Sequence, residues 1–359
     1  MKSKYTEAGV DIDKGNQIVK DIKGMVRSTF SPAVLADIGL FGGLYDITGL
    51  GEGENVLVAS IDGVGTKLHL AAQLNRFRGV GHDIVAHCCD DIVVQGARPL
   101  FFLDYVAAAD LTVEGVTEIV AGITEECRTN HCALLGGETA EMPGTYCRGQ
   151  YDLAGCIVGV VNRQKLIDGK TIKPGDVAVA LPSSGLHTNG FSLARKILFQ
   201  DGGYDLSYMP EAGGPTLGDI LLEPHRSYIP TVLPLIDAIP VKGLAHITGG
   251  GLYENVPRIL PEGTGVTFDA KAFPVPFIYQ FMQKLGEVDP KEMYRVFTPT
   301  VLLGFLLPWA WGISSRLLQQ STAIAPYLGR GVSPHCRPSL PSMWDSSSRP
   351  SCTHAATAP

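Results

Sequence analysis

Four glycine-rich loops, each carrying a carboxylate, an amide or a histidine, are the part of this sequence best suited to chemistry. They occupy residues 62–67, 136–141, 183–190 and 246–251. Glycine lets backbone N–H groups approach an anion closely, and neighbouring carboxylates can hold Mg²⁺ against the same phosphates. One such loop would be weak evidence, but four in one chain predict a site built around a polyphosphate.

The first loop reads Asp-Gly-Val-Gly-Thr-Lys and follows a predicted buried strand, which is a position that suits a phosphate site. It lacks the G-x-x-x-x-G-K-[ST] pattern of a P-loop, so an ordinary P-loop NTPase is disfavoured. A glycine turn capped by Asp62 is an equally good interpretation of this segment taken alone.

Acidic side chains accompany the loops. Asp90 and Asp91 are adjacent within a predicted helix, where apolar neighbours indicate that at least one carboxylate is shielded from water and needs a cation or another partner. Glu138 and Glu141 follow a predicted strand at the end where ligand sites of α/β proteins gather. Solvated acids without a function are the alternative in both cases.

Two histidines belong to the later loops. His187 lies in a Ser/Gly/Asn loop that leads into a predicted helix, and His246 stands before Thr248 and three glycines. A helix amino terminus binds anions, so His187 could act as a general acid–base beside a bound phosphate. For an isolated loop histidine a structural role is the more common one, and His246 has the same ambiguity.

Alternating strand and helix patterns must position these loops. Strands are predicted at 56–61, 100–106, 133–135, 151–161, 177–181 and 266–269, and helices at 84–93, 113–127 and 252–260. This alternation predicts an α/β or α+β fold. A turn-rich break between residues 167 and 176 predicts the boundary between two domains.

The composition favours a soluble, intracellular enzyme or binding protein, which we expect to be cytoplasmic. The 359 residues carry 29 basic and 36 acidic side chains, a net charge of −7, which argues against nucleic acid or a membrane surface as a partner. The amino terminus lacks the apolar region of a secretory signal, and the apolar stretch 301–313 is too short to cross a bilayer. The eight cysteines show neither a disulfide framework nor the spacing of a structural zinc site.

The segment 298–359 has a different composition from the rest. It contains all three tryptophans and no lysine or glutamate, and its last part has no helical or strand period. Pro299 and Pro308 are expected to interrupt any strand or helix that begins there. We therefore predict a disordered tail that supplies no strand to the second domain. A switched reading frame or misjoined exon is one hypothesis for its origin, and a fast-evolving extension is the other.

Taken together, the motifs resemble the phosphoribosylformylglycinamidine cyclo-ligase family, whose members are also called aminoimidazole ribonucleotide synthetases. The segments that carry the resemblance are DGVGTK at 62–67, DDIVVQGARPLFFLDY at 90–105, GGETAEMPGTY at 136–146, SSGLHTNGFSLARKI at 183–197 and AHITGGGLYENVPRILP at 245–261. YTEAGVDIDKGNQIVKDIK at 5–23 and GLFGGLYDI at 39–47 extend it toward the amino terminus. The resemblance covers about residues 5–297 and its motifs are specific at this density.

The resemblance implies a two-domain fold and an ATP-dependent reaction in purine biosynthesis. ATP would activate the formyl amide oxygen of formylglycinamidine ribonucleotide as a phosphate ester, after which a nitrogen closes the imidazole ring and phosphate leaves. It implies Mg²⁺ ligands at Asp62, Asp91 and Glu138, and catalytic roles for His187 and Lys67. ATP and its phosphates would contact Lys23, Gly63, Gly65, Thr66, Lys67 and Gly137, and substrate would contact Ser184, His187, Asn189, His246, Gly249 and Gly250. A homodimer formed by the amino-terminal domains is also implied.

The resemblance divides the chain into four parts. These are a flexible segment, 1–50, that contributes to the nucleotide site; an ATP-binding and dimerisation domain, 51–167; a truncated carboxyl-terminal domain, 168–297; and the tail, 298–359. Family members commonly have Asn where Asp90 stands, so an extra negative charge is expected beside the metal site.

Two alternatives stay open. One is a catalytically defective product that binds nucleotide without turnover. The other is a different ATP-using member of the superfamily that includes selenophosphate synthetase, thiamine-monophosphate kinase and formylglycinamidine synthase. A selenophosphate synthetase would be expected to carry a reactive cysteine near its amino terminus, and residues 1–50 contain none.

Overall fold

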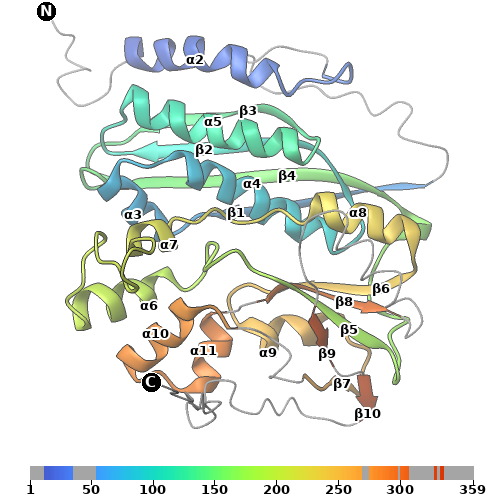
Figure 1. Cartoon of the computed structure of the whole chain (residues 1–359). Helices are drawn as coiled ribbons and strands as arrows, with labels where there is room; N and C mark the ends of the chain where they lie inside the picture. The colour runs from blue at the N-terminus through green and yellow to red at the C-terminus, as the bar shows by residue number, and fades with distance from the viewer. Residues whose placement is uncertain are drawn as a thin grey trace, which may run out of the picture.

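Two four-stranded sheets, one in each half of the chain, organise the protein (Figure 1). The computed structural model describes residues 12–34, 54–268, 275–297, 300–306, 327–329 and 332–334. Helices and strands alternate through both halves, which confirms the predicted fold class.

The first sheet is built from residues that follow one another closely in the sequence. Its strands lie in the order β1 (Asn55–Gly63), β4 (Tyr151–Asn162), β2 (Arg98–Ala108) and β3 (Ala133–Glu141). β4 runs antiparallel to β1 and β2, whereas β2 and β3 are parallel. A parallel pair requires a crossover connection, and α5 (Val113–Thr129) provides it.

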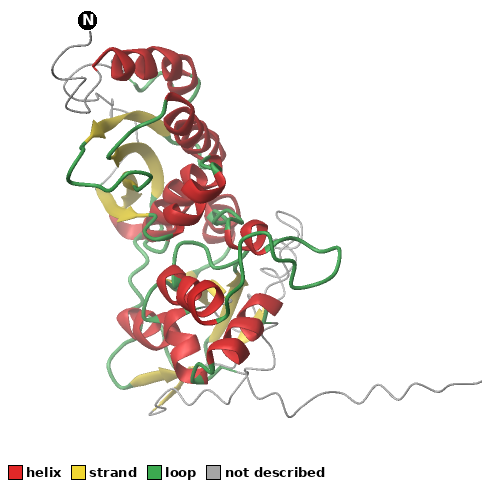
Figure 2. Cartoon of the chain, turned by 90° about the vertical axis from the view of Figure 1, so that its left-hand side faces the viewer, coloured by secondary structure: helices red, strands yellow, loops and turns green. Residues whose placement is uncertain are grey.

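Helices cover one face of this sheet, as Figure 2 shows. α3 (Lys67–Leu74), α4 (Arg78–Val93) and α5 bury apolar side chains against it. α4 and α5 approach so closely that a Cβ atom on Gly122 would lie 2.0 Å from the carbonyl oxygen of Arg78. Likewise, a Cβ atom on Gly81 would lie 2.1 Å from the carbonyl oxygen of Ile119. Only glycine permits this contact between helix backbones.

The opposite face of the first sheet carries exposed apolar side chains. Successive residues of a strand point to opposite faces, so β1 buries Val58 toward the helices and directs Leu57 and Ile61 outward. Leu57 is 58% exposed and Ile61 is 74% exposed. Apolar side chains of this size on a strand indicate a surface that suits contact with another molecule.

The amino-terminal segment contains a long helix, which corrects the expectation that residues 1–50 are flexible. α2 (Ile12–Arg27) contacts α5 and β3, and buries Ile18 and Val26. With Ile22 these residues recur every four positions, which is the spacing of one helical face. Residues 1–11 and 35–53 lie outside the described residues, so the rest of that expectation stays a prediction.

The second sheet is assembled from distant parts of the chain. Its strands lie in the order β6 (Val241–His246), β8 (Thr300–Leu306), β5 (Val177–Pro182) and β9 (Tyr327–Gly329), with every neighbouring pair antiparallel. β8 is therefore an interior strand. β7 (Thr264–Val266) and β10 (Val332–Pro334) form a separate two-stranded ladder.

β8 shows that the prediction of a tail without strands is wrong. Pro299 precedes its paired residues in the sequence and Pro308 follows them, so the two prolines flank the strand and do not interrupt it. A short continuous apolar run is also typical of an interior strand. The second domain thus has the strand that we expected it to lack. Residues 335–359 lie outside the described residues, and their disorder stays a prediction.

Short helices surround the second sheet. They are α6 (Phe191–Arg195), the π-helical turn η2 (Lys196–Asp201), α7 (Leu217–Leu221), α8 (Ile229–Ala238), α9 (Gly251–Asn255), η3 (Val256–Ile259), α10 (Phe277–Gly286) and α11 (Pro290–Val296). α6 begins after Gly190, without a side-chain cap. α8 contacts α4 of the first domain. No helix in the described ranges is long and apolar enough to cross a membrane.

Candidate functional site

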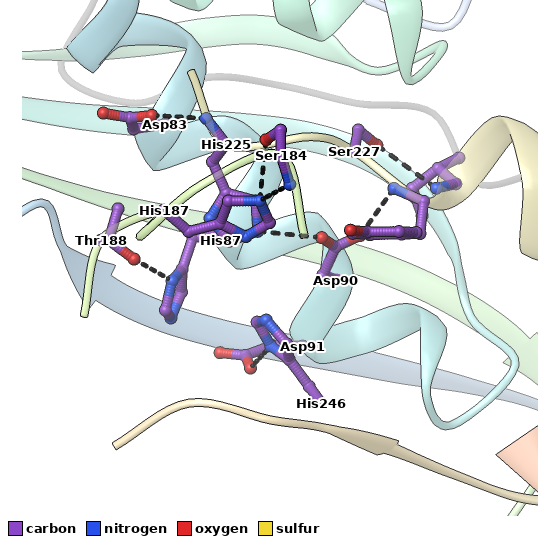
Figure 3. Close-up of polar contacts among 12 residues, drawn as sticks. Asp83, His87, Asp90, Asp91, Ser184, His187, Thr188, His225, Ser227 and His246 are labelled. Carbon is purple, nitrogen blue, oxygen red and sulfur yellow. Dashed lines mark hydrogen bonds and ion pairs between the residues drawn. The ribbon is translucent and has the colours of Figure 1, made fainter. Parts of the chain in front are cut away.

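Four histidines and several aspartates meet where the two halves of the chain face each other (Figure 3). Asp62 comes from the end of β1, His87, Asp90 and Asp91 from α4, His187 from the loop after β5, His225 from the segment before α8, and His246 from the end of β6. Residues three and four apart share one face of a helix, which explains why α4 supplies three of them. All four imidazoles are buried.

Asp62 and His87 form an ion pair at the end of β1. Asp62 Oδ2 lies 2.7 Å from His87 Nε2, and His87 Nδ1 lies 2.8 Å from the Thr188 hydroxyl. Burial alone would raise the pKa of Asp62, but His87 outweighs burial and lowers it. Burial alone would lower the pKa of His87, but Asp62 outweighs burial and raises it. Each group therefore stabilises the charged form of the other.

Asp91 belongs to a second carboxylate–imidazole pair. Its Oδ1 lies 2.7 Å from His246 Nδ1, and its Oδ2 accepts a hydrogen bond of 2.7 Å from the Ser60 hydroxyl. Burial opposes ionisation, but the neighbouring histidines hold the pKa of Asp91 below its ordinary value. The side chains of Asp91 and Asp62 are 28% and 43% exposed. These two ionised carboxylates are thus the members of the cluster that a ligand can reach.

His187 and His225 form a neutral pair. Their rings stack with centroids 3.9 Å apart, and burial lowers the pKa of each well below its ordinary value. The Ser184 N–H donates to His187 Nε2 at 2.9 Å, so the proton of His187 resides on Nδ1. His187 also has a φ of 57°, a left-handed conformation that non-glycine residues adopt at a cost of about 1–3 kcal/mol, often at functional sites.

Asp90 ties α4 to the second half of the chain. Its Oδ1 accepts a hydrogen bond of 3.0 Å from the Tyr228 N–H, and its Oδ2 lies 3.2 Å from His225 Nε2. Asp90 is fully buried, and burial raises the pKa of its carboxyl well above the ordinary value. The negative charge that we expected Asp90 to add is therefore disfavoured, and both of its oxygens are occupied.

Lys67 does not lie where the resemblance implied. Its side chain is fully buried, with Nζ 2.7 Å from Asp83 Oδ2 and donating to the Glu223 carbonyl at 2.8 Å. Asp83 also accepts a hydrogen bond of 2.7 Å from the His225 N–H. Lys67 thus links the two domains in their shared interior. The predicted catalytic and phosphate-binding roles of Lys67 do not fit this placement.

The first loop and the later loops face one another across the domain interface. Thr66 Oγ1 lies 3.1 Å from the hydroxyl of Ser192 in α6. A Cβ atom on Gly249 would lie 3.8 Å from Asn189 Oδ1, so the loop of Asn189 and the loop of Gly249 are also neighbours. The structure therefore brings three of the four predicted loops together.

The glycines predicted to bind ligands occupy different structural environments. The Gly63 N–H donates to Asp62 Oδ1 at 2.6 Å, and Gly65 has a φ of 70° with open space where a side chain would be. Gly250 has a φ of 91° and caps α9. A Cβ atom on Gly137 would lie 2.4 Å from Asp104 Oδ1, so packing in the sheet explains this glycine. Of these four, Gly65 offers backbone that a ligand can approach.

Glu138 lies too far from the other predicted metal ligands to share an ion with them in one chain. It is exposed on the edge strand β3, whereas Asp62 is on β1 at the other edge, with β4 and β2 between them. Three strand spacings amount to about 14 Å. The predicted set of Asp62, Asp91 and Glu138 is therefore wrong for a single chain.

Lys23 also lies away from the cluster. It is on α2, which packs against α5 and β3 on the far side of the helix layer, as Figure 1 shows. The predicted contact between Lys23 and ATP is therefore not supported within one chain.

Two residues of the cluster were not predicted, namely His87 and His225. A signal for His87 exists, because it precedes Asp90 and Asp91 by three and four residues on the same predicted helix. His225 follows Glu223 and Pro224 in a segment without any period, and only the tertiary fold brings it against α4.

Two family models and several solved structures are similar to this chain. AIR synthase related protein, N-terminal domain, matches residues 42–161, and AIR synthase related protein, C-terminal domain, matches residues 173–308. Thiamine-monophosphate kinase from Stenotrophomonas maltophilia K279a has the same fold, with a TM-score of 0.66 and 17% identity over 89% of this chain and 96% of that chain. The structure of hydrogenase maturation protein HypE in complex with ATP has a TM-score of 0.62 to this chain and 18% sequence identity. The match covers 89% of this chain and 86% of that chain.

Relatives with a higher sequence identity identify the family within this fold. Phosphoribosylformylglycinamidine cyclo-ligase of Desulfitobacterium hafniense (strain DSM 10664 / DCB-2) is 52% identical over 307 residues, which are 86% of this chain and 89% of the relative. The protein of the same name from Bifidobacterium animalis subsp. lactis (strain AD011) is 48% identical over 298 residues, 83% of this chain and 87% of the relative. The chain belongs to the phosphoribosylformylglycinamidine cyclo-ligase family, which confirms the resemblance seen in its motifs. The match reaches residue 308, beyond residue 297 where we expected it to end.

Proposed function

We propose that this chain catalyses the ATP-dependent closure of the imidazole ring of formylglycinamidine ribonucleotide in purine biosynthesis, releasing aminoimidazole ribonucleotide, ADP and phosphate. The observation that carries the proposal is a pair of ionised, accessible carboxylates, Asp62 and Asp91, beside an open glycine loop in a chain of the cyclo-ligase family.

Asp62 and Asp91 fit Mg²⁺, which prefers oxygen ligands and is commonly held by one or two carboxylates together with substrate phosphates. When bound, the ion would neutralise the charge on the phosphates during transfer. His87 and His246 keep both carboxylates ionised and oriented before ATP arrives. Phosphoryl transfer needs mainly positioning and charge neutralisation, so no protein nucleophile is required.

His187 would serve as a proton donor or a positioning group on the substrate side. Its Nε2 already accepts the Ser184 N–H, and its Nδ1 is buried without a hydrogen-bond partner among the described residues. His187 lines a small cavity together with Asn189, His246 and Thr248. A neutral imidazole in that position could donate a hydrogen bond to the amide or amidine of the substrate.

The test compares two carboxylate variants with a matched control. Asp62→Asn and Asp91→Asn each remove one charged oxygen ligand, and we expect ADP release with formylglycinamidine ribonucleotide to fall by about 100-fold or more. Asp201→Asn, in which an exposed aspartate loses its pair with Lys196, should keep full activity. Retained activity in both site variants would remove them from the site, and a wild-type chain that binds ATP without forming product would support the defective-product alternative.

We also infer that two copies associate through the open face of the first sheet. Leu57 and Ile61 project from β1 on this face, and a second copy would cover them. Ile61→Lys should convert a dimer to a monomer in light scattering. Met209→Lys is the control. It changes a side chain that is 50% exposed in the second half of the chain, and the dimer should persist. A wild-type chain that is monomeric and active would contradict the inference.

A further inference from the structure

Two imidazoles and one carboxylate in the cluster lie close enough to share a metal ion. His87, Asp91 and His246 each offer a ligand atom, and these atoms lie within 4.8 Å of one another (Figure 3). Zn²⁺ binds imidazole nitrogen and carboxylate oxygen at about 2.0–2.2 Å, so tetrahedral ligands are about 3.4 Å apart. Small rotations of the three side chains would bring their ligand atoms to about 3.4 Å from one another. We propose that His87, Asp91 and His246 form a binding site for Zn²⁺.

Neighbouring hydroxyl groups hold two of these ligands in orientation. The Ser60 hydroxyl donates to Asp91 Oδ2, and Asp91 Oδ1, which lies 2.7 Å from His246 Nδ1, would turn to the ion. Thr188 Oγ1 lies 2.8 Å from His87 Nδ1, so His87 would bind the ion through Nε2, the nitrogen that is now paired with Asp62. Metal ligands in proteins are characteristically hydrogen-bonded through their second polar atom in this way. Asp62 Oδ2, at 2.7 Å from His87 Nε2, is placed to become a fourth ligand.

His246 supplies the observation that points to a ligand independently of the carboxylates. Its Nδ1 lies beside Asp91 Oδ1, while its Nε2 is buried and has no hydrogen-bond partner in the part of the chain that the structure describes. The ring therefore carries more hydrogen-bonding capacity than its surroundings use. Zn²⁺, which readily takes imidazole nitrogen, matches this group, whereas Mg²⁺ prefers oxygen alone.

A second group of three, Asp90, His225 and His246, also lies within 4.8 Å, but it is closed. All three residues are buried, and the oxygens of Asp90 are taken by Tyr228 and His225. The proposed site, in contrast, borders Asp91 and Asp62, both of which reach solvent. The first group therefore borders solvent through Asp91, whereas all three members of the second are buried.

This site does not depend on the proposed reaction, because Zn²⁺ would bind without ATP or substrate. The two are nevertheless coupled through Asp91 and Asp62, which cannot serve Zn²⁺ and an ATP-bound Mg²⁺ at the same time. Zn²⁺ should therefore inhibit ADP release, and added Mg²⁺ and ATP should relieve the inhibition.

The experiment titrates the metal-free full chain with Zn²⁺ against a chromophoric chelator, in excess Mg²⁺ and without ATP. We expect one strongly bound Zn²⁺ per chain, and affinity at least about 100-fold lower in His87→Gln and in His246→Gln. His225→Asn is the comparison variant: it removes no ligand of the proposed site, although its ring packs against His87 and His246, so it should reduce the affinity far less than the two ligand variants do. Zinc X-ray absorption should show imidazole ligands.

Three outcomes would overturn the proposal. They are no tight Zn²⁺ binding, binding that survives His87→Gln but is lost in His225→Asn, and sulfur ligands near 2.3 Å that would move the ion to cysteines. If a ligand variant does not fold, as judged by circular dichroism, Thr188→Val provides the second test. It keeps every ligand and should weaken Zn²⁺ binding by about tenfold through His87; unchanged affinity there would count against the site.

Discussion

The two sheets of this protein are encoded in different ways. The first takes its four strands from residues 55–162, and a βαβ unit and antiparallel neighbours arise from elements that are close in sequence. The second combines strands from 177–182, 241–246, 300–306 and 327–329, and its interior strand β8 joins two strands that precede it by many residues. The first domain therefore depends on local contacts, whereas the second depends on one late segment. Separate perturbations should affect the two domains separately.

The largest effect is expected from Leu303→Pro. Leu303 pairs with Ala180 on β5 and Ala245 on β6, so proline removes a backbone donor from the middle of the sheet. The loss should exceed about 5 kcal/mol, which is the whole margin of many domains. Limited proteolysis followed by mass spectrometry should then degrade residues beyond about 165 and leave the first domain intact.

Thr300→Pro is the control for this comparison, because proline is tolerated at the first residue of a strand. Thr300→Pro should leave the second domain resistant to limited proteolysis. Simultaneous loss of both domains in Leu303→Pro would show that the first domain cannot stand without the second.

Lys67→Met should produce the next largest effect, because it acts on the link between the domains. It leaves Asp83 buried without its cation, which typically costs about 3–5 kcal/mol. Urea denaturation should show this loss in both domains at once, and Asp83→Asn in the same chain should recover part of it. Lys196→Met breaks an exposed pair with Asp201 and should cost less than about 1 kcal/mol. Equal effects of the two lysine variants would contradict this account.

Gly122→Val tests the local contact of the first domain. The added side chain would overlap the Arg78 carbonyl and separate α4 from α5, at a cost of about 3 kcal/mol. Thermal unfolding by circular dichroism measures the change. Gly136→Ala, where nothing lies within 4 Å of the added atom, should stay within about 1 kcal/mol of wild type. A small effect of Gly122→Val would mean that the helices are less tightly apposed.

Acid should weaken the domain interface by a smaller and gradual amount. Burial lowers the pKa of His187 and His225 well below their ordinary 6.5, so the unfolded chain binds protons there before the folded chain does. This stability is fully present above about pH 6.5 and is lost as pH falls, by up to about 1.4 kcal/mol per pH unit for each histidine. His225→Asn should reduce the slope of urea stability against pH, and an unchanged slope would contradict the assignment.

The sequence predicts the fold best where the pattern is local. The strands at 56–61, 100–106 and 151–161 and the helix at 113–127 correspond to β1, β2, β4 and α5. β8 was missed because a short apolar run bounded by prolines has the same local pattern whether it pairs or not; its pairing depends on β5 and β6, far away in the chain.

The residues of the site also differ in how far local sequence identifies them. Asp62, Asp91, His187 and His246 were identified from their loops and helix, and the structure brings them together. His225 could not be identified, because its position depends on how the second domain docks against α4. Lys67 was misassigned for a related reason: a lysine after a glycine loop looks like a phosphate ligand until a buried carboxylate such as Asp83 is known to face it.

The late position of β8 also has a consequence for synthesis on the ribosome. The last strand of the first sheet is complete at residue 162, whereas β8 is complete only at residue 306. At about 5–20 residues per second the interval is on the order of 10 s, far longer than a small sheet needs to form. β5 is complete at residue 182 and β6 at residue 246, and until β8 follows each has an edge without their shared neighbour, which other chains could pair with. The second half of the nascent chain is therefore the part that most needs protection by chaperones.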